Sequence, residues 1–420
     1  MIEISNFQEP IISVGIILPE DKQNKLLIVD SLNQKEFKIS IEKNNLIVNN
    51  ESINSFSLKR KFKNIENSYF LLDSVIAGRG FHWQKKISIK IEGDLHISKN
   101  AGSIFLVNKI PVESYLMCVA TSEMGGKCPS AFLEAQTIAA RSWLIAAAEK
   151  KHKDLKIDVC NDDCCQRYQG INNLTSLSKN ASKTTFGVVL THKNSICDTR
   201  YSKSCGGHSE NNENVWRGNH KKYLKGISDN AINRSHNLMN EEDFFGWIKN
   251  PPNSFCNDSI FKKGELKKYL GSVDESESYF RWSWKISQIE LTKNINKKAL
   301  TNFDNIQTII PIKRGLSGRI LKLKIVGESS SKNSELTLNT EYEIRRILHP
   351  KFLLSSAFII ETTFYNNNSI PNNFIFKGSG WGHGVGLCQI GALKMALDGK
   401  SSIQILRHYF SSIKVKKIYE

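Results

Sequence analysis

The stretch from residue 130 to about residue 150 restricts the possible folds of this chain most, because its apolar residues cover nearly every side of a helix. It begins after Pro129, and proline is favoured in the first turn of a helix. A helix that is apolar all round is normally buried in a protein core. We therefore expect this helix to be enclosed by the rest of a folded domain.

Other segments predict a mixture of strands and helices. Residues 1 to about 107 contain short β-branched runs separated by turn residues, which is typical of strands, at 11–18, 25–29 and 87–92. Pro111 then precedes apolar residues at helical spacing, and Gly125 and Gly126 end that helix. Further along we predict strands at 282–291, 319–326 and 374–376, and helices at 341–348 and 389–397.

These elements predict the mixed α/β (α+β) fold class, with two main parts. Residues 1–90 are expected to form a β-rich N-terminal region, and residues 91–420 a larger domain. The stretch at about 240–275 combines prolines, asparagines, serines and a lysine-rich run. We interpret it as a surface insertion in that larger domain.

Charge and hydropathy disfavour or exclude some classes of protein. The chain has 58 Lys and Arg residues against 41 Asp and Glu residues, for a net charge of +17. The lysines are spread out without a block of like charges, so we predict a basic surface that attracts polyanions and no nucleic-acid partner. No apolar run approaches the roughly 20 residues of a membrane span, and the first ten residues lack the pattern of a secretory signal. We expect neither a transmembrane segment nor a visible signal peptide.

Glu123 is the first candidate catalytic residue. It lies about three turns and 20° after Val112, so it continues the apolar stripe of its helix. Burial raises the pKa of a carboxyl because the charged form loses hydration, and a raised pKa suits a general acid. The small Gly125 and Gly126 would leave room for a ligand beside it. The alternative is a helix-end Glu that points into solvent or pairs with a lysine.

Arg141 is the single cation inside the helix that we expect to be buried. A buried guanidinium without a partner costs several kcal/mol, so a carboxylate must meet it. The candidates are Glu134, seven residues earlier on the same stripe, and Glu123. A purely structural pair between Glu134 and Arg141 remains an equal alternative to a role in catalysis.

A glycine-rich stretch from Lys377 to Gln389 is the second candidate site. Glycine alternates with other residues at 378, 380, 382, 384 and 386, and this spacing does not match the dinucleotide-binding pattern. The backbone is therefore open to close approach, and Trp381 and His383 are its large side chains. A flat aromatic ring beside a histidine suits a sugar-binding or catalytic surface. The alternative is a tight strand-to-helix connection in which His383 bonds only to the backbone.

Cysteines provide the third candidate site. Their number, nine, is odd, so complete pairing within the chain is impossible. Cys160, Cys164 and Cys165, with His152 upstream, supply four soft ligands, enough for a tetrahedral Zn²⁺ site. A local disulfide or free thiols are the alternatives. The remaining cysteines are interpreted as isolated, small buried residues: Cys118, Cys128, Cys197, Cys205, Cys256 and Cys388.

Several motifs, in this order, resemble the SpoIID/LytB family, over about residues 90–235 and 280–420. They are Ile110–Leu116, Thr121–Met124, Glu134–Arg141, Cys165–Gly170, Ser204–Glu210 and Gly380–Gln389. The resemblance implies a SpoIID-like core and a protein active on peptidoglycan. Members similar to stage II sporulation protein D are lytic transglycosylases that cut denuded glycan strands, and others are described as enhancers of cell-wall amidases.

The resemblance also implies roles for individual residues. The family's catalytic acid falls on Glu123, its following arginine on Arg141, and its Trp-Gly-His-Gly loop on Trp381 to Gly384, with His383 as a further catalytic candidate. The substrate-binding candidates are Trp381, Gly382, Gly384, Gln389, Gly206, Gly207 and Tyr201.

The family's zinc pattern is only partly kept. Some members bind zinc through a Cys-x4-Cys pair with a histidine before the second cysteine. Cys160 and Cys165 match that pair, whereas Cys164 replaces the histidine and His152 would be the fourth ligand. Two other departures are Glu134, where many members carry lysine, and Gly-Gly-Lys after Met124 in place of the usual proline.

The favoured prediction is thus a lytic transglycosylase with Glu123 as its acid and base. One carboxyl suffices because the sugar's own hydroxyl attacks, whereas most glycosidases need two. The alternative is a non-catalytic protein that binds peptidoglycan and enhances an amidase. Zinc is an expected structural cofactor, glycan strands and an amidase are the expected partners, and the cell envelope is the expected location.

Overall fold

The computed structural model describes residues 8–60, 68–81, 83–216, 218–230, 237–262, 264–271, 278–365 and 369–420. The chain divides into two compact units. Unit 1 comprises Met1–Asp198, Lys268–Glu275 and Lys414–Glu420, and unit 2 comprises Thr199–Lys267 and Ser276–Ile413. Each unit is described by itself.

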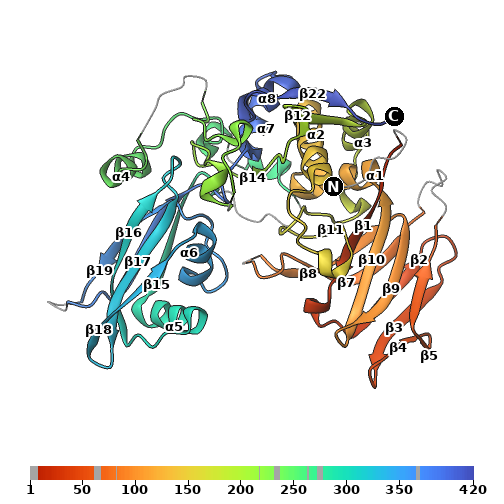
Figure 1. The fold of residues 1–420 in the computed structure, drawn as a ribbon, viewed down its shortest axis with the longest axis horizontal. Helices are drawn as coiled ribbons and strands as arrows, with labels where there is room; N and C mark the ends of the chain where they lie inside the picture. The colour runs from red at the N-terminus through yellow and green to blue at the C-terminus, as the bar shows by residue number, and fades with distance from the viewer. Residues whose placement is uncertain are drawn as a thin grey trace. The chain divides into compact units, whose positions relative to one another are not determined.

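Two sheets form the N-terminal part of unit 1 (Figure 1). One has the strand order β11-β1-β10-β9-β6 and the other has the order β5-β4-β3-β2-β7-β8. Alternating burial in strands such as Leu26–Ile28 and Phe37–Ile39 explains why their sequences form half-buried strands. The strands are β1 (Ile11–Ile17), β2 (Lys25–Asp30), β3 (Glu36–Glu42), β4 (Asn45–Val48), β5 (Glu51–Ile53), β6 (Ser55–Leu58), β7 (Phe70–Ala77), β8 (Lys85–Ile91), β9 (Asp94–Asn100), β10 (Ser103–Pro111) and β11 (Val159–Cys160).

The first helix of unit 1 begins directly after strand β10. Strand β10 ends at Pro111, which is also the cap of α1 (Val112–Glu123). Helix α2 (Ser130–Ala146) buries 12 of its 17 residues, which confirms that it is a core helix. It contacts α1, α3 (Ser176–Thr184) and β12 (Val188–His192). Strand β12 lies between β13 (Ser195–Ile196) and the C-terminal β22 (Lys414–Lys417).

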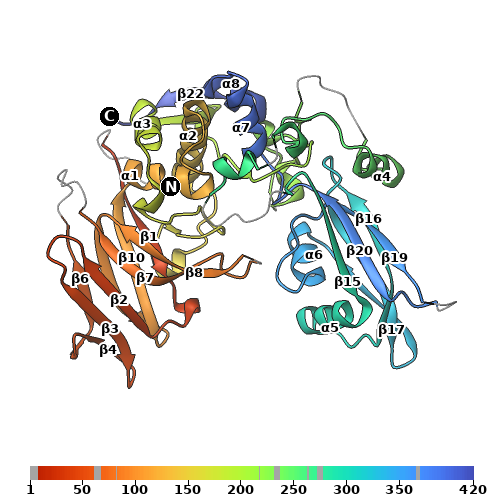
Figure 2. The same cartoon turned by 180° about the vertical axis from the view of Figure 1, so that it is seen from behind.

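Unit 2 has one large core between two three-stranded sheets and two helices (Figure 2). The sheet orders are β15-β20-β19 and β16-β17-β18, and a short pair joins β14 to β21. The strands are β14 (Tyr201–Ser202), β15 (Arg281–Ser287), β16 (Asn305–Arg314), β17 (Ile320–Ser329), β18 (Lys332–Leu338), β19 (Phe358–Thr363), β20 (Asn373–Ser379) and β21 (Leu387–Cys388). The helices are α4 (Glu241–Lys249), α5 (Gln288–Ala299), α6 (Glu341–Leu348), α7 (Gln389–Leu397) and α8 (Ser402–Tyr409).

Short 3-10 helices complete the list of elements. They are Pro19–Asp21, Lys153–Leu155, Ile171–Asn173, Asn212–Asn214, Lys222–Leu224, Asp258–Ile260 and Leu266–Tyr269. Among the residues that the structure describes, no helix has the length and apolar character needed to cross a membrane.

The mixed α+β class is confirmed, and so are the helices at 341–348 and 389–397. The strand expected over 282–291 is wrong in its second half, because β15 ends at Ser287 and α5 starts at Gln288. Ser287 accepts a hydrogen bond from the Glu290 backbone N–H, and the Glu290 side chain binds back to Ser287. This reciprocal cap starts a helix where β-branched and aromatic residues alone indicate a strand.

The predicted domain boundary and the predicted surface insertion can be compared with the observed elements. The N-terminal boundary near residue 90 lies within β8, and the stretch at 240–275 contains α4. Residues 263 and 272–275 of that stretch lie outside the described part of the chain. The division at residue 90 and the insertion remain proposals about domain organisation.

Candidate functional site

Glu123 is the last residue of α1 and is 7% exposed. Its Oε1 accepts a hydrogen bond from the backbone N–H of Arg167 at 3.0 Å. The carboxyl therefore lies against the segment that follows the first cysteine cluster. The expected burial is confirmed, and the catalytic role stays a prediction.

The space beside Gly125 and Gly126 is filled by other segments of the protein. The prediction that these glycines leave room for a ligand is therefore wrong. A Cβ on Gly125 would lie 2.6 Å from the Leu270 carbonyl oxygen, and the Gly125 N–H donates to the Tyr269 carbonyl at 2.7 Å. A Cβ on Gly126 would lie 2.5 Å from Cγ2 of Thr175. The two glycines thus allow three segments of unit 1 to pack closely at the end of α1.

A charged group that the sequence did not indicate lies near Glu123. The Arg167 guanidinium donates to Asp163 at 2.5 Å and stacks over Trp83 at 4.3 Å from the ring centroid. Burial raises the pKa of Asp163 to about 7, against the opposing charge of Arg167, and the nearby Asp162 and Glu123 charges raise it further. Glu123 is therefore one of several interacting charged groups, although sequence spacing alone presented it as a lone acid.

Arg141 forms an ion pair with Glu113. The prediction that its partner is Glu134 or Glu123 is therefore wrong. Its Nε donates to Glu113 Oε1 at 2.7 Å, its Nη2 donates to Glu113 Oε2, and its Nη1 donates to the Val188 carbonyl at 2.9 Å. Arg141 is fully buried and Glu113 is 5% exposed. Glu113 also accepts hydrogen bonds from Ser182 and Tyr419. This network joins α1, α2, α3 and the C-terminal segment.

In unit 2, the structure brings several predicted substrate-binding residues together. The segment around Trp381 connects β20 to β21, and Trp381 exchanges backbone hydrogen bonds with Ser204 at 2.8 and 3.2 Å. Tyr201 pairs with Leu387 through the parallel strands β14 and β21. A Cβ on Gly206 would lie 2.8 Å from the Gly380 nitrogen. The loop after β14 and the glycine-rich segment therefore form one local structure.

Rings surround the two large side chains of the glycine-rich segment. Trp381 lies 4.7 Å from Tyr279, and His383 lies 4.7 Å from Trp216 in an edge-on arrangement. The Arg200 guanidinium lies over Trp216 at 4.2 Å. Trp381 and His383 are both partly exposed. Sequence reasoning missed Trp216, Tyr279 and Arg200, because nothing in their spacing links them to this segment.

His383 also bonds to the backbone, since its Nδ1 accepts a hydrogen bond from the Val385 N–H at 3.0 Å. A bond of this kind belongs to the alternative in which the segment is a tight strand-to-helix connection. The glycines have a structural reason as well. Gly384 has a φ of 74°, and a Cβ there would lie 2.3 Å from Cζ of the buried Arg319. Arg319 in turn donates to the Gly382 carbonyl at 3.1 Å. Part of the alternating pattern therefore makes room for an arginine.

The remaining two predicted substrate-binding residues are buried. Gly207 has a φ of 107°, and a Cβ there would lie 2.8 Å from Trp247. Gln389 is the first residue of α7 and is 1% exposed. Both residues border the Trp381 segment in sequence or in space, and their roles in substrate binding stay predictions.

The first cysteine cluster is assembled as the sequence predicted. Ligand atoms of His152, Cys160, Cys164 and Cys165 all lie within 4.8 Å of one another. Cys164 Sγ is 2.9 Å from Cys160 Sγ and 3.5 Å from His152 Nε2. Zn–S bonds of about 2.3 Å in a tetrahedron place ligand atoms about 3.8 Å apart. The donor set and the distance between Cys164 and His152 fit Zn²⁺, whereas the sulfur atoms of Cys160 and Cys164 lie closer together than in a zinc-bound pair.

Cys205, Cys256 and Cys388 are buried as expected, but the expectation that they are isolated is wrong. Their sulfur atoms and a carboxylate oxygen of Asp229 all lie within 4.8 Å of one another. Their positions in the sequence, up to 183 residues apart, give no sign of this contact.

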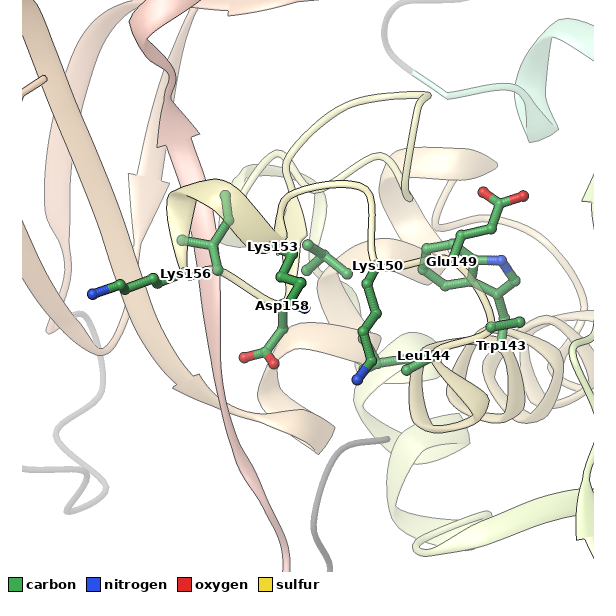
Figure 3. A pocket seen from close by; sticks show the side chains of 11 residues that line it. Trp143, Leu144, Glu149, Lys150, Lys153, Lys156 and Asp158 are labelled. Carbon is green, nitrogen blue, oxygen red and sulfur yellow. The ribbon is translucent and has the colours of Figure 1, made fainter. Parts of the chain in front are cut away.

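A cavity of about 260 Å³ lies beside the C-terminal end of α2 in unit 1 (Figure 3). Its lining includes Trp143, Lys150 and Asp158, whose side chains are labelled in the figure. A second cavity of about 600 Å³ in unit 2 is lined in part by Arg281 and Trp282. Neither lining contains a residue that the sequence predicted as catalytic.

Family models match two regions of the chain. The model described as Stage II sporulation protein matches residues 100–192, which include Glu123, Arg141 and the first cysteine cluster. A model described as a domain of unknown function (DUF8618) matches residues 210–386, which include Trp381 and His383.

Three bacterial proteins are similar to this chain over at least 70% of its length. An uncharacterised protein of Brachyspira hyodysenteriae is 25% identical, over 78% of this chain and 72% of that protein. The Stage II sporulation protein D of Bacillus amyloliquefaciens is 23% identical, over 74% of this chain and 76% of that protein. The Amidase enhancer of Bacillus subtilis is 23% identical, over 70% of this chain and 39% of that protein.

Proposed function

Because this chain belongs to the SpoIID/LytB family, we propose that it is a peptidoglycan lytic transglycosylase that cuts denuded glycan strands. One observation carries the proposal: Glu123 is a carboxyl with 7% exposure at the end of α1, within the region matched by the stage II sporulation model. Relatives named for sporulation and for amidase enhancement support a function related to the cell wall.

In the proposed reaction, the protonated Glu123 carboxyl donates its proton to the leaving glycosidic oxygen. The C6 hydroxyl of the same sugar attacks the anomeric carbon, and the Glu123 carboxylate accepts the proton of that hydroxyl. The products are a free sugar end and a 1,6-anhydro end, so no water is consumed and Glu123 regains its proton. A second carboxyl is not required as nucleophile or base, unlike in hydrolytic glycosidases.

The surroundings of Glu123 support these two proton transfers. The backbone N–H of Arg167 donates to Oε1 at 3.0 Å, and this hydrogen bond orients the carboxyl at the end of α1. Arg141 acts in this proposal as a positioning residue, because its guanidinium holds Glu113 in the first turn of α1.

We propose separately that the glycine-rich segment of unit 2 binds sugar. Trp381 and His383 are partly exposed and flanked by Tyr279 and Trp216, which suits stacking against sugar rings. The polar backbone around them would supply hydrogen bonds to hydroxyl groups. The binding candidates remain Trp381, His383, Gly382, Gly384, Gln389, Gly206, Gly207 and Tyr201.

We also propose that the first cysteine cluster holds a structural Zn²⁺. The ligands would be His152, Cys160, Cys164 and Cys165. Cys160 belongs to β11, which pairs with β1, so the ion would tie the loop before Arg167 to the sheet. Bound zinc would supply only rigidity, since four protein ligands leave no open position for substrate.

An amidase enhancer is the second candidate function, favoured by the relative of that name. In this alternative the chain binds peptidoglycan and stimulates a cell-wall amidase without cutting glycan itself. Both candidates place the protein in the cell envelope, where the basic surface, with a net charge of +17, would attract the carboxylates of cell-wall polymers.

Mass spectrometry of denuded glycan strands incubated with the purified chain separates the two candidates. The transglycosylase predicts fragments with 1,6-anhydro ends and no added water. The enhancer predicts no fragments from the chain alone and faster peptide release when a purified amidase and intact peptidoglycan are present. Absence of both effects would contradict both candidates.

A further inference from the structure

A second group of metal-type ligands lies in unit 2, outside the candidate sites described so far. Cys205, Asp229, Cys256 and Cys388 place one ligand atom each within 4.8 Å of the others. All four are buried, with exposures of 2% for Cys205 and 0% for the other three. They come from four separate segments of the chain, so their meeting is a product of the tertiary fold.

The spacing of the sulfur atoms fits a metal centre. Cys205 and Cys256 have their sulfurs 3.6 Å apart. This is close to the distance of about 3.8 Å between ligands of tetrahedral zinc and far from the S–S bond of about 2.05 Å. A disulfide would use only two of the three thiols.

Neighbouring groups fix the carboxylate of Asp229 in place. Its Oδ1 accepts from the Tyr409 hydroxyl at 2.7 Å, and its Oδ2 accepts from the Cys256 N–H at 3.1 Å. Its own N–H donates to the Gly207 carbonyl at 3.0 Å. Metal-binding carboxylates are commonly oriented by hydrogen bonds of this kind. Each oxygen keeps a further lone pair for an ion.

Cys388 lies in surroundings that favour a negatively charged sulfur. The Cys205 N–H donates to its Sγ at 3.2 Å, and Cys388 is the residue directly before the first turn of α7, although its side chain makes no capping hydrogen bond. Both the N–H group and the positive end of a nine-residue helix stabilise a thiolate. Thiolate is the form that binds a metal.

A buried carboxylate requires a positive partner. Nε2 of His408 lies 3.6 Å from Oδ1 of Asp229, and this contact is an ion pair only when the imidazole is protonated. Arg281 lies near the loop of Cys205, where it donates to the Gly206 carbonyl. If an ion binds and the three thiols lose their protons, the cluster carries four negative charges, and a divalent cation would compensate part of them.

We propose that Cys205, Cys256, Cys388 and Asp229 bind a structural Zn²⁺ in unit 2. The ion replaces the protons of the three thiols, which leave to solvent as binding occurs. With four protein ligands and full burial, the site is closed and structural. It would join the loop after β14, the bend at Asp229, the loop after α4 and the start of α7.

The test measures zinc in the full chain, purified from zinc-supplemented cells without chelators. A background variant, His152→Ala with Cys164→Ala, removes donors of the first cluster and leaves unit 2 unchanged. We expect this background to retain one zinc per chain. Adding Cys256→Ala should lower its zinc content at least tenfold, whereas the matched buried control Cys118→Ala should leave it unchanged.

Two further measurements cover the case in which Cys256→Ala fails to fold. Asp229→Asn removes a charged ligand at constant size and should weaken zinc retention against a competing chelator. Cobalt loaded into the background variant should give a thiolate charge-transfer band. A zinc-free background variant that is folded would overturn the proposal, as would peptide mapping of the wild-type chain that finds Cys205 disulfide-bonded to Cys256 or Cys388.

Discussion

Arg141 and Glu113 form a buried two-point ion pair that holds the middle of α2 against the first turn of α1. The pair lies at the opposite end of α1 from Glu123. Arg141 therefore acts on the proposed acid through the position of the helix, because its guanidinium nitrogens already bond to Glu113 and to the Val188 carbonyl.

Removing one partner of this pair should destabilise the fold strongly. Glu113→Gln leaves the Arg141 charge buried without its counter-charge, a change that costs about 3–5 kcal/mol. Urea unfolding followed by circular dichroism measures the loss. The control is Glu134→Gln on the same helix, which should cost less than about 1 kcal/mol because Glu134 is partly exposed. Equal losses in the two variants would contradict the assignment of Glu113 as the partner.

Gly384→Ala tests whether the glycine-rich segment is built around Arg319. The substitution combines an unfavourable positive φ with a Cβ that would lie 2.3 Å from the guanidinium carbon. Gly399→Ala is a matched control, since its φ is 80° and a Cβ there meets nothing within 4 Å. We expect the control to lose about 1–2 kcal/mol of unfolding free energy. Gly384→Ala should lose clearly more, as measured by thermal unfolding. Similar losses would mean that Arg319 moves aside easily.

The start of α5 provides a local test of the cap at Ser287. Ser287→Ala removes the acceptor for the Glu290 N–H and should cost about 1 kcal/mol of unfolding free energy. Ser283→Ala, an exposed serine in the preceding strand, should change stability little. The assignment of the cap fails if the two variants are equally stable.

Zinc in the first cysteine cluster can be tested separately from the cluster in unit 2. Cys164→Ser should lower the zinc content of the chain by one equivalent and reduce the melting temperature, because the ion would cross-link β11 to the loop before Arg167. Elemental analysis and calorimetry measure the two effects, with Cys118→Ala as the control. Unchanged zinc content in Cys164→Ser would remove this site.

The sequence predicted those features that depend on neighbours along the chain. Helical periodicity predicted α1, and an apolar run that follows Pro129 predicted α2. The spacing of Cys160, Cys164 and Cys165 predicted a four-ligand cluster that the structure assembles with His152. The burial of Glu123 also followed from its place on the apolar stripe. In each case a short-range pattern carries the information.

Features that depend on contacts between distant segments were missed. Glu113 is 28 residues from Arg141 and stands one helix earlier, so the periodicity of α2 pointed to Glu134 instead. Cys205 and Cys388 meet across 183 residues, and no local pattern relates them. The helix α5 is different: its capping residues Ser287 and Glu290 are three positions apart in the sequence, but the strand prediction over 282–291 did not take them into account.

The most direct test of the proposed function is the action of Glu123→Gln on denuded glycan strands. We expect release of fragments with 1,6-anhydro ends to fall by about 100-fold or more, because the amide cannot deliver or accept the proton, while circular dichroism and melting temperature stay close to wild type. Glu134→Gln should keep its activity. A folded Glu123→Gln chain that releases these fragments at the wild-type rate would contradict the account.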